Sequence, residues 1–306
     1  MTENLASEIL ELKKQRNAVI LAHNYQIAEV QDVADFVGDS LGLSIAAGKT
    51  DAKLIIFCGV HFMAETAAIL CPDKIVLMPE ENAGCPMADM ITAAGLGKLK
   101  SEHPKAKVVC YVNTSAEVKA ESDICCTSAN AVKVVNSIKD TDEIIFVPDK
   151  YLGMHTASKV QDKKFIFWEG FCPTHLKIMP EHIQKLKQEH PQAKVIVHPE
   201  CRPEVIRLAD EVLSTEGMVN FSKKTEAKEI IVGTEVGMLY RLKKENPGKT
   251  FYPATELAVC PNMKLTTLEK VLWSLEDLKT EIKVPKDIAN RARLAIEKMI
   301  EIGRQD

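Results

Sequence analysis

Short apolar runs recur along the chain, and segments with a helical pattern separate them. The first set consists of AVILA, KVVCYV and KVIV, which begin at Ala18, Lys107 and Lys194. These runs are rich in β-branched residues and do not alternate with polar positions, which is typical of strands buried on both faces of a parallel sheet. Two further sets follow, KLIIFCGV, DEIIFVP and KEIIVG, and then DKIVLMP, KKFIFW and KTFYP. Because strands and helices alternate, the pattern predicts an α/β protein built of αβα sandwiches with parallel sheets.

The chain contains three copies of one unit, each predicted to read strand, loop, helix, strand, helix, strand. VILAHNYQIAEVQDVADFVGDS, VVCYVNTSAEVKAESDICCTS and VIVHPECRPEVIRLADEVLST align without gaps on the Glu-Val pairs at Glu29, Glu117 and Glu204, which lie 88 and 87 residues apart. A period of this length suits a small α/β domain, and it predicts three domains related by pseudo-threefold symmetry. The predicted domains are residues 5–89, 90–177 and 178–264, followed by C-terminal helices in 265–306 that pack back on the assembly.

Composition narrows the possible functions. Of 306 residues, 46% are hydrophobic and 27% are charged, and the net charge is −4. These values fit an ordinary globular protein and leave no basic surface that would predict a nucleic-acid partner. No apolar run approaches the roughly 18 residues of a membrane span, and the start MTENLASEIL does not resemble a secretory signal. Nine cysteines without such a signal favour a reducing compartment, so a cytoplasmic protein is expected.

Three of the nine cysteines share one register in the repeat. Cys85, Cys172 and Cys260 lie 56, 55 and 56 residues after the Glu-Val anchors, and each is followed by proline. Threefold symmetry would bring the three thiols to one axis and create a metal site that C-x-x-C spacing does not reveal. A structural zinc site is closed by four ligands, whereas a [4Fe–4S] cluster on three cysteines keeps one iron open as a Lewis acid. The alternative is three unligated buried cysteines.

Polar residues also recur in register. The positions six and four residues before the anchors follow directly on the first buried runs, at the carboxyl ends of strands, where α/β sheets bind ligands. Two residues two apart on a strand point to the same face, so each pair is expected to face one site. The hydroxyl eleven residues after each anchor is expected to begin the second helix of its unit, where carboxylate or phosphate oxygens bind. Alternatively, a lone histidine after a strand has only a structural role, with its side chain capped by hydrogen bonds. These positions are His23, Tyr111 and His198; Tyr25, Asn113 and Glu200; and Ser40, Ser128 and Thr215.

The segments LAHNYQ, GDSLGLS, GCPMA, YVNTSAEVKAESDICCTSAN, CPTH, HPECRPEV, STEGM, GTEVGM and AVCPNMK resemble the quinolinate synthase family in order and spacing. The resemblance covers nearly the whole chain. It implies a [4Fe–4S] cluster on three cysteines, one from each of three similar α/β domains. It also implies a transferase that condenses iminoaspartate with dihydroxyacetone phosphate, losing phosphate and water, to form quinolinate for NAD biosynthesis. An aspartate oxidase or dehydrogenase would supply the iminoaspartate.

The resemblance also implies roles for individual residues. The cluster ligands would be Cys85, Cys172 and Cys260. The substrate contacts would be His23, Ser40, Tyr111, Asn113, Ser128, His175, His198, Glu200 and Thr215. Glu200, with His198 beside it, is the preferred general base, and Tyr25 and Tyr111 are expected to relay protons or steady an enolate oxygen. Some relatives carry a C-x-x-C-x-x-C run near the third ligand; here the sequence is CPNMK, so no redox-switch disulfide is expected there. Cys125, Cys126 and Cys201 receive no role.

Two other functions fit part of the pattern. A radical enzyme of the diphthamide-synthesis type also places one cysteine in each of three domains, but it binds S-adenosylmethionine at the open iron. The nine polar positions argue against it, and a spectroscopic titration with S-adenosylmethionine distinguishes the two. An iron–sulfur carrier or sensor without enzymatic activity would have no need for His23, Glu200 or Tyr111.

Overall fold

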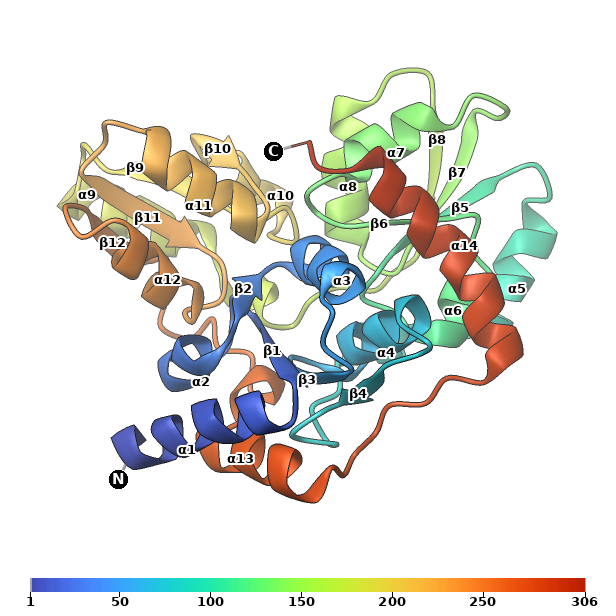
Figure 1. The fold of residues 1–306 in the computed structure, drawn as a ribbon. Helices are drawn as coiled ribbons and strands as arrows, with labels where there is room; N and C mark the ends of the chain where they lie inside the picture. The colour runs from blue at the N-terminus through green and yellow to red at the C-terminus, as the bar shows by residue number, and fades with distance from the viewer. Residues whose placement is uncertain (1, 306) are drawn as a thin grey trace.

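The computed structural model describes residues 2–305, and within them the chain forms three parallel sheets of four strands each (Figure 1). The strand order is β2-β1-β3-β4, β6-β5-β7-β8 and β10-β9-β11-β12. The predicted α/β class with three similar parallel units is therefore confirmed. The strands are β1 (Ala18–His23), β2 (Phe36–Gly38), β3 (Leu54–Cys58), β4 (Ile75–Leu77), β5 (Lys107–Tyr111), β6 (Ile124–Cys126), β7 (Glu143–Val147), β8 (Lys164–Phe167), β9 (Lys194–Val197), β10 (Glu211–Val212), β11 (Glu229–Gly233) and β12 (Thr250–Pro253).

Each unit contains one strand more than the predicted order of elements. The additional strands β2, β6 and β10 are two or three residues long and lie at one edge of their sheets. Polar residues bound these strands closely, in ADFVGDS, SDICCTS and DEVLST, so no apolar run stands out, whereas the equally short β4 lies within the longer run DKIVLMP. The predicted order was wrong on this point in all three units.

Helices and buried side chains cover both faces of each sheet. In β1, Val19 and Leu21 belong to one buried cluster, and Ile20 and Ala22 belong to another. Since neighbouring side chains of a strand point to opposite faces, both faces of this sheet are buried. The helices are α1 (Thr2–Gln15), α2 (Ala28–Val33), α3 (Ser40–Lys49), α4 (His61–Leu70), α5 (Ala93–Glu102), α6 (Ala116–Ala120), α7 (Ala131–Ser137), α8 (Lys150–Lys159), α9 (Pro180–Glu189), α10 (Pro203–Ile206), α11 (Thr215–Lys224), α12 (Met238–Glu245), α13 (Leu268–Asp277) and α14 (Lys286–Ile302).

An aspartate stands six residues after the Glu-Val anchor of each unit, and it performs the same task in all three. Asp35 Oδ2 accepts a hydrogen bond from the Ile20 amide at 2.8 Å, Asp123 Oδ2 from Val108 at 2.8 Å, and Asp210 Oδ2 from Val195 at 2.7 Å. A lysine pairs with each carboxylate: Lys13, Lys107 and Lys194. The recurring aspartate therefore joins the start of the edge strand to the first strand of its sheet.

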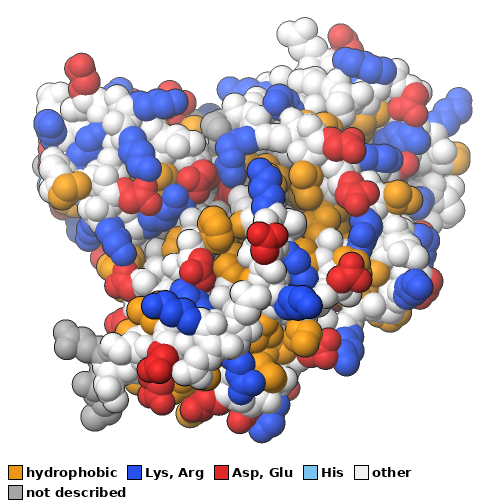
Figure 2. Space-filling model, viewed as in Figure 1, with side chains coloured by type: hydrophobic (Ala, Val, Ile, Leu, Met, Phe, Trp, Pro, Cys, Tyr) orange, Lys and Arg blue, Asp and Glu red, His pale blue; other side chains and the backbone are white. Residues whose placement is uncertain are grey.

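The C-terminal helices pack back on the first two units. Helix α13 lies against α1 and β3, and α14 lies against α6, β6 and α4 (Figure 1). The boundaries 5–89, 90–177, 178–264 and 265–306 themselves stay predictions. Figure 2 shows acidic and basic side chains interspersed over one face, which is hollowed between the second and third units. Across residues 2–305, no helix is both long and apolar enough to span a membrane.

Candidate functional site

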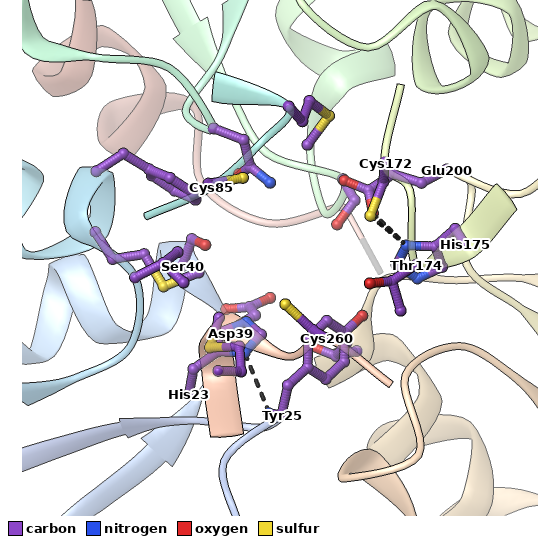
Figure 3. A pocket seen from close by; sticks show the side chains of 18 of the residues that line it. His23, Tyr25, Asp39, Ser40, Cys85, Cys172, Thr174, His175, Glu200 and Cys260 are labelled. Carbon is purple, nitrogen blue, oxygen red and sulfur yellow. Dashed lines mark hydrogen bonds and ion pairs between the residues drawn. The ribbon is translucent and has the colours of Figure 1, made fainter. Parts of the chain in front are cut away.

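One cavity lies where the three units meet, and all thirteen predicted site residues line it (Figure 3). It encloses about 680 Å³ of space, part of which opens to solvent. The convergence expected from the repeat is therefore present, while the role of each residue stays a prediction. The thirteen residues are His23, Tyr25, Ser40, Cys85, Tyr111, Asn113, Ser128, Cys172, His175, His198, Glu200, Thr215 and Cys260.

The first strand of each unit delivers its polar residues to the cavity from its carboxyl end. His23 ends β1, Tyr111 ends β5, and His198 immediately follows β9. Their partners Tyr25, Asn113 and Glu200 lie beyond the strands, so alternation along a strand is not what aims them at the cavity. Tight turns aim two of them instead. The Gln26 amide donates to the His23 carbonyl at 2.9 Å, and the Cys201 amide donates to the His198 carbonyl at 3.0 Å.

The hydroxyl residues lie at helix starts in two units out of three. Ser40 is the first residue of α3 and Thr215 is the first residue of α11. Ser128 lies three residues before α7, so the prediction that it begins a helix was wrong. Here the Asn130 side chain accepts from the Thr127 amide at 2.8 Å, which holds residues 127–130 in a turn before the helix begins.

The three cysteines in register reach the cavity from equivalent loops. A short 3₁₀ turn follows each one, at Ala88–Met90, His175–Lys177 and Asn262–Leu265. Figure 3 shows the sulfur atoms of Cys85, Cys172 and Cys260 on different sides of one open space. Burial raises the pKa of Cys85 to about 12, and it also raises the pKa of Cys172 and Cys260. Three bare thiolates would therefore be unfavourable here, whereas a bound cation offsets that cost.

Hydrogen bonds link the polar residues across the units. Glu200 Oε2 lies 2.7 Å from His175 Nδ1 and 3.3 Å from His198 Nδ1. His198 Nε2 is 3.1 Å from Ser128 Oγ. On the other side, His175 Nε2 is 2.8 Å from Thr234 Oγ1, which lies 2.6 Å from the Tyr25 hydroxyl. A continuous chain of polar groups thus runs from Tyr25 to Ser128.

Burial and neighbouring charges set the protonation of these groups. Burial raises the pKa of Tyr25 and of Tyr111 well above the usual value for a phenol, and the Glu200 carboxylate adds to both shifts. Burial lowers the pKa of His23 to about 4. Burial alone would raise the pKa of Glu200, but the charges and hydrogen bonds of His175 and His198 outweigh it and lower that pKa well below its usual value. At neutral pH the site therefore holds a carboxylate, two phenols and a neutral His23.

Comparison with known proteins identifies the family of this chain. A family model described as "NadA: Quinolinate synthetase A protein" matches residues 7–301. The chain belongs to the quinolinate synthase family. It is 61% identical over 300 residues to the quinolinate synthase of Dehalococcoides mccartyi, covering 98% of this chain and 99% of that protein. It is also similar to the quinolinate synthases of Thermodesulfovibrio yellowstonii, at 57% identity over 99% of each chain, and Methanosarcina barkeri, at 56% over 97% of each.

Several residues of the site were not predicted from the sequence. Asp39 lines the cavity and caps α3 by accepting from the Gly42 amide at 2.8 Å. An aspartate immediately before a predicted helix start is a recognisable N-cap signal. Thr234 carried no such signal, because only the fold brings it between Tyr25 and His175. The other cavity residues absent from the prediction are Val60, Phe62, Met63, Gly84, Met87, Thr127, Thr174 and Met263.

Two buried acceptor atoms in the cavity have no hydrogen-bond partner among the described residues. They are Asn113 Oδ1 and Glu200 Oε1. A buried polar atom without a partner costs free energy, so each is suited to a group that enters the cavity. A second arrangement concerns metals: ligand atoms of Cys172, His175 and Glu200 all lie within 4.8 Å of one another. This set could hold a metal ion, and it shares Cys172 with the three cysteines in register.

Proposed function

We propose that this protein is a quinolinate synthase that condenses iminoaspartate with dihydroxyacetone phosphate, releasing phosphate and water. The observation that carries the proposal is the meeting of three cysteines in register and nine polar residues in register at one cavity. Relatives that are named quinolinate synthase and are 56–61% identical over nearly the whole chain support it.

The donor set fits a [4Fe–4S] cluster. Cys85, Cys172 and Cys260 come from equivalent loops of three units and line the same cavity, and thiolates are the ligands that such clusters take. The six remaining cysteines are buried and do not line the cavity. When bound, a cluster on three cysteines supplies one iron with an open position, which polarises a substrate oxygen as a Lewis acid.

Glu200, with His198 beside it, supplies the proton acceptor in this proposal. Glu200 Oε1 is buried and has no hydrogen-bond partner among the described residues, so it is the atom that takes a carbon-bound proton. A carboxylate with a lowered pKa is a weak base on its own. His198 Nδ1 lies 3.3 Å from Oε2 and His175 Nδ1 lies 2.7 Å from it, so both imidazoles hold the carboxylate in position.

The remaining polar groups bind and orient. Tyr25 and Tyr111 are protonated phenols, and they donate to a substrate oxygen on which negative charge develops. Ser40 and Thr215 begin helices of ten residues each, whose first amides and partial positive charge favour carboxylate or phosphate oxygens. The amide of Asn113 and the neutral His23 complete a polar wall around the substrates.

A second candidate is a single metal ion held by Cys172, His175 and Glu200, whose ligand atoms lie within 4.8 Å of one another. This set of one sulfur, one nitrogen and one oxygen donor suits a zinc ion with an open position. It would occupy both His175 and Glu200 and so remove the proton acceptor from the mechanism above.

Metal analysis and a direct assay separate these proposals. Anaerobically purified protein is expected to hold about four irons and four sulfides per chain and to form quinolinate from both substrates. Alanine at Cys85, Cys172 or Cys260 is expected to abolish the cluster, while Cys110→Ala and Cys201→Ala, at buried positions outside the cavity, serve as controls. One zinc per chain without sulfide would favour the single-ion site. If the control variants lost the cluster equally, the three cysteines in register would not be its specific ligands.

The proposed reaction also implies a place in the cell. We expect a cytoplasmic protein that contributes to NAD biosynthesis and takes its iminoaspartate from an aspartate oxidase or dehydrogenase. Small molecules are its expected partners, and neither nucleic acid nor a membrane is expected.

A further inference from the structure

Behind Cys260 lies an ion pair that the mechanism above does not use. Glu235 stands two residues after β11 and its side chain is completely buried, at 0% exposure. Lys264 Nζ lies 3.0 Å from Glu235 Oε1 and 3.1 Å from Glu235 Oε2. Taking such a pair out of water is costly, so a buried carboxylate persists only where several donors satisfy it.

The other donors to Glu235 are backbone amides at the site. The Cys260 amide donates to Oε1 at 3.1 Å, and the Gly237 amide donates to Oε2 at 2.7 Å. Lys264 Nζ in turn donates to the Tyr25 carbonyl. One ion pair thus holds the backbone of a predicted cluster ligand and the backbone of a residue from the first unit.

The space around the pair is filled. A Cβ added at Gly237 would lie 2.6 Å from Lys264 Nζ and 2.8 Å from the Tyr25 carbonyl oxygen. These distances are too short for any side chain, so glycine here lets the lysine reach both acceptors. The arrangement is built tightly enough to fix where the two charges sit relative to Cys260.

We propose that the Glu235–Lys264 pair fixes the Cys260 loop and sets the reduction potential of the cluster bound there. The proposal rests on the proposed function, because it requires the cluster. Charge near an iron–sulfur cluster and hydrogen bonds to its sulfurs set its potential. Glu235 acts in both ways. It places a negative charge beside the predicted ligand Cys260, and its Oε1 accepts from the Cys260 N–H, which therefore does not donate to a cluster sulfur. Lys264 neutralises part of that charge.

Redox titration of the intact protein, followed by the electron paramagnetic resonance of the reduced cluster, tests the proposal. Glu235→Gln keeps an acceptor for the Cys260 amide but removes the negative charge while Lys264 remains. Its potential is expected to shift to more positive values with the cluster retained. Glu229→Gln makes the same substitution at the far end of β11 and is the matched control, with no expected shift.

The outcomes are distinguishable. A parent protein without a cluster would overturn the proposed function itself. A parent with a cluster and a Glu235→Gln variant of unchanged potential would overturn this inference alone. If Glu235→Gln loses its cluster, Lys264→Gln decides: it removes the positive charge and must shift the potential to more negative values, and an unchanged potential there would overturn the inference.

Discussion

At the scale of single residues, the position of Glu200 between two imidazoles governs what the cavity can do. A carboxylate that accepts hydrogen bonds from His175 and His198 stays ionised at neutral pH, and its second oxygen remains available. The same two histidines lead outward to Ser128 and to Thr234. The contacts of the Glu200 carboxylate are to side chains, so removing its charge is expected to remove the proton acceptor without disturbing the backbone around it.

Glu200→Gln keeps the size of the side chain and removes its ability to accept a proton. Turnover per intact cluster is expected to fall by about 10²–10⁴, the usual contribution of a positioned general base. The cluster spectrum and substrate binding are expected to be unchanged. Quinolinate formation is measured in the variant, in the parent and in Glu204→Gln, an exposed glutamate four residues further on. Activity within a few-fold of the parent would remove Glu200 from the mechanism and direct attention to Tyr25 or His198.

His23 makes stability depend on pH. Burial lowers its pKa from 6.5 to about 4, so between these values the unfolded chain binds a proton that the folded protein does not. Stability from this residue is complete above pH 6.5 and declines as the pH falls toward 4. Between pH 7.5 and 5.5 the loss is about 1 kcal/mol. Urea unfolding of the parent and of His23→Asn at both pH values measures it. The variant is expected to lose less stability on acidification, and equal losses would contradict the shifted pKa.

At the scale of elements, the sequence predicted what repeats and missed what is short or local. The first buried strand of each unit and the loops of the three cysteines followed from apolar runs and matched register. The edge strands β2, β6 and β10 did not, because their two or three residues stand directly between polar residues and form no longer apolar run. Ser128 shares the register of Ser40 and Thr215, yet a local turn held by Asn130 delays its helix. Register therefore predicted where a residue lies better than which element contains it.

The recurring aspartate is expected to stabilise each sheet by a similar amount. Asp210 accepts from the Val195 amide at 2.7 Å and pairs with Lys194, and Asp210→Ala leaves that amide without its acceptor. The free energy of unfolding is expected to fall by about 1–2 kcal/mol, the usual effect of losing one such bond. Urea unfolding measures it, with the neighbouring exposed Glu211→Ala as the control. An effect no larger than that of the control would show that the repeated aspartate does not hold the edge strand.

At the scale of the whole molecule, the site exists only because three units meet. No unit contains it alone: the cysteines, the histidines and the hydroxyl residues each come from more than one sheet. The repeat made this convergence predictable from the sequence. Contacts that break the symmetry were not predictable, because nothing in the register indicates them. Thr234 between Tyr25 and His175 is one such contact, and the C-terminal segment that reaches Asp39 is another.

That C-terminal segment joins the first two units beside the cavity, close to the end of α14 (Figure 1). The two terminal nitrogens of the Arg304 guanidinium, Nη1 and Nη2, each donate to the Asp39 carboxylate at 2.8 Å, and the Gln305 amide donates to the Ala129 carbonyl at 2.9 Å. Asp39 lines the cavity next to Ser40, and its side chain is only 8% exposed. Without Arg304 a nearly buried negative charge would remain at the helix start that is proposed to bind anionic substrates.

Arg304→Met is therefore expected to act on stability and on binding together. The free energy of unfolding is expected to fall by about 1–3 kcal/mol, because a charged hydrogen-bonded pair is broken on one side. The KM for the anionic substrates is expected to rise several-fold, because Asp39 then repels them. Arg291→Met is the matched control: it removes an arginine of α14 whose pair with Glu121 is half exposed, and such pairs contribute about 1 kcal/mol or less. Urea unfolding and initial rates are measured for both variants. If Arg304→Met changed stability and KM no more than Arg291→Met does, the C-terminal segment would have no part in holding the site together.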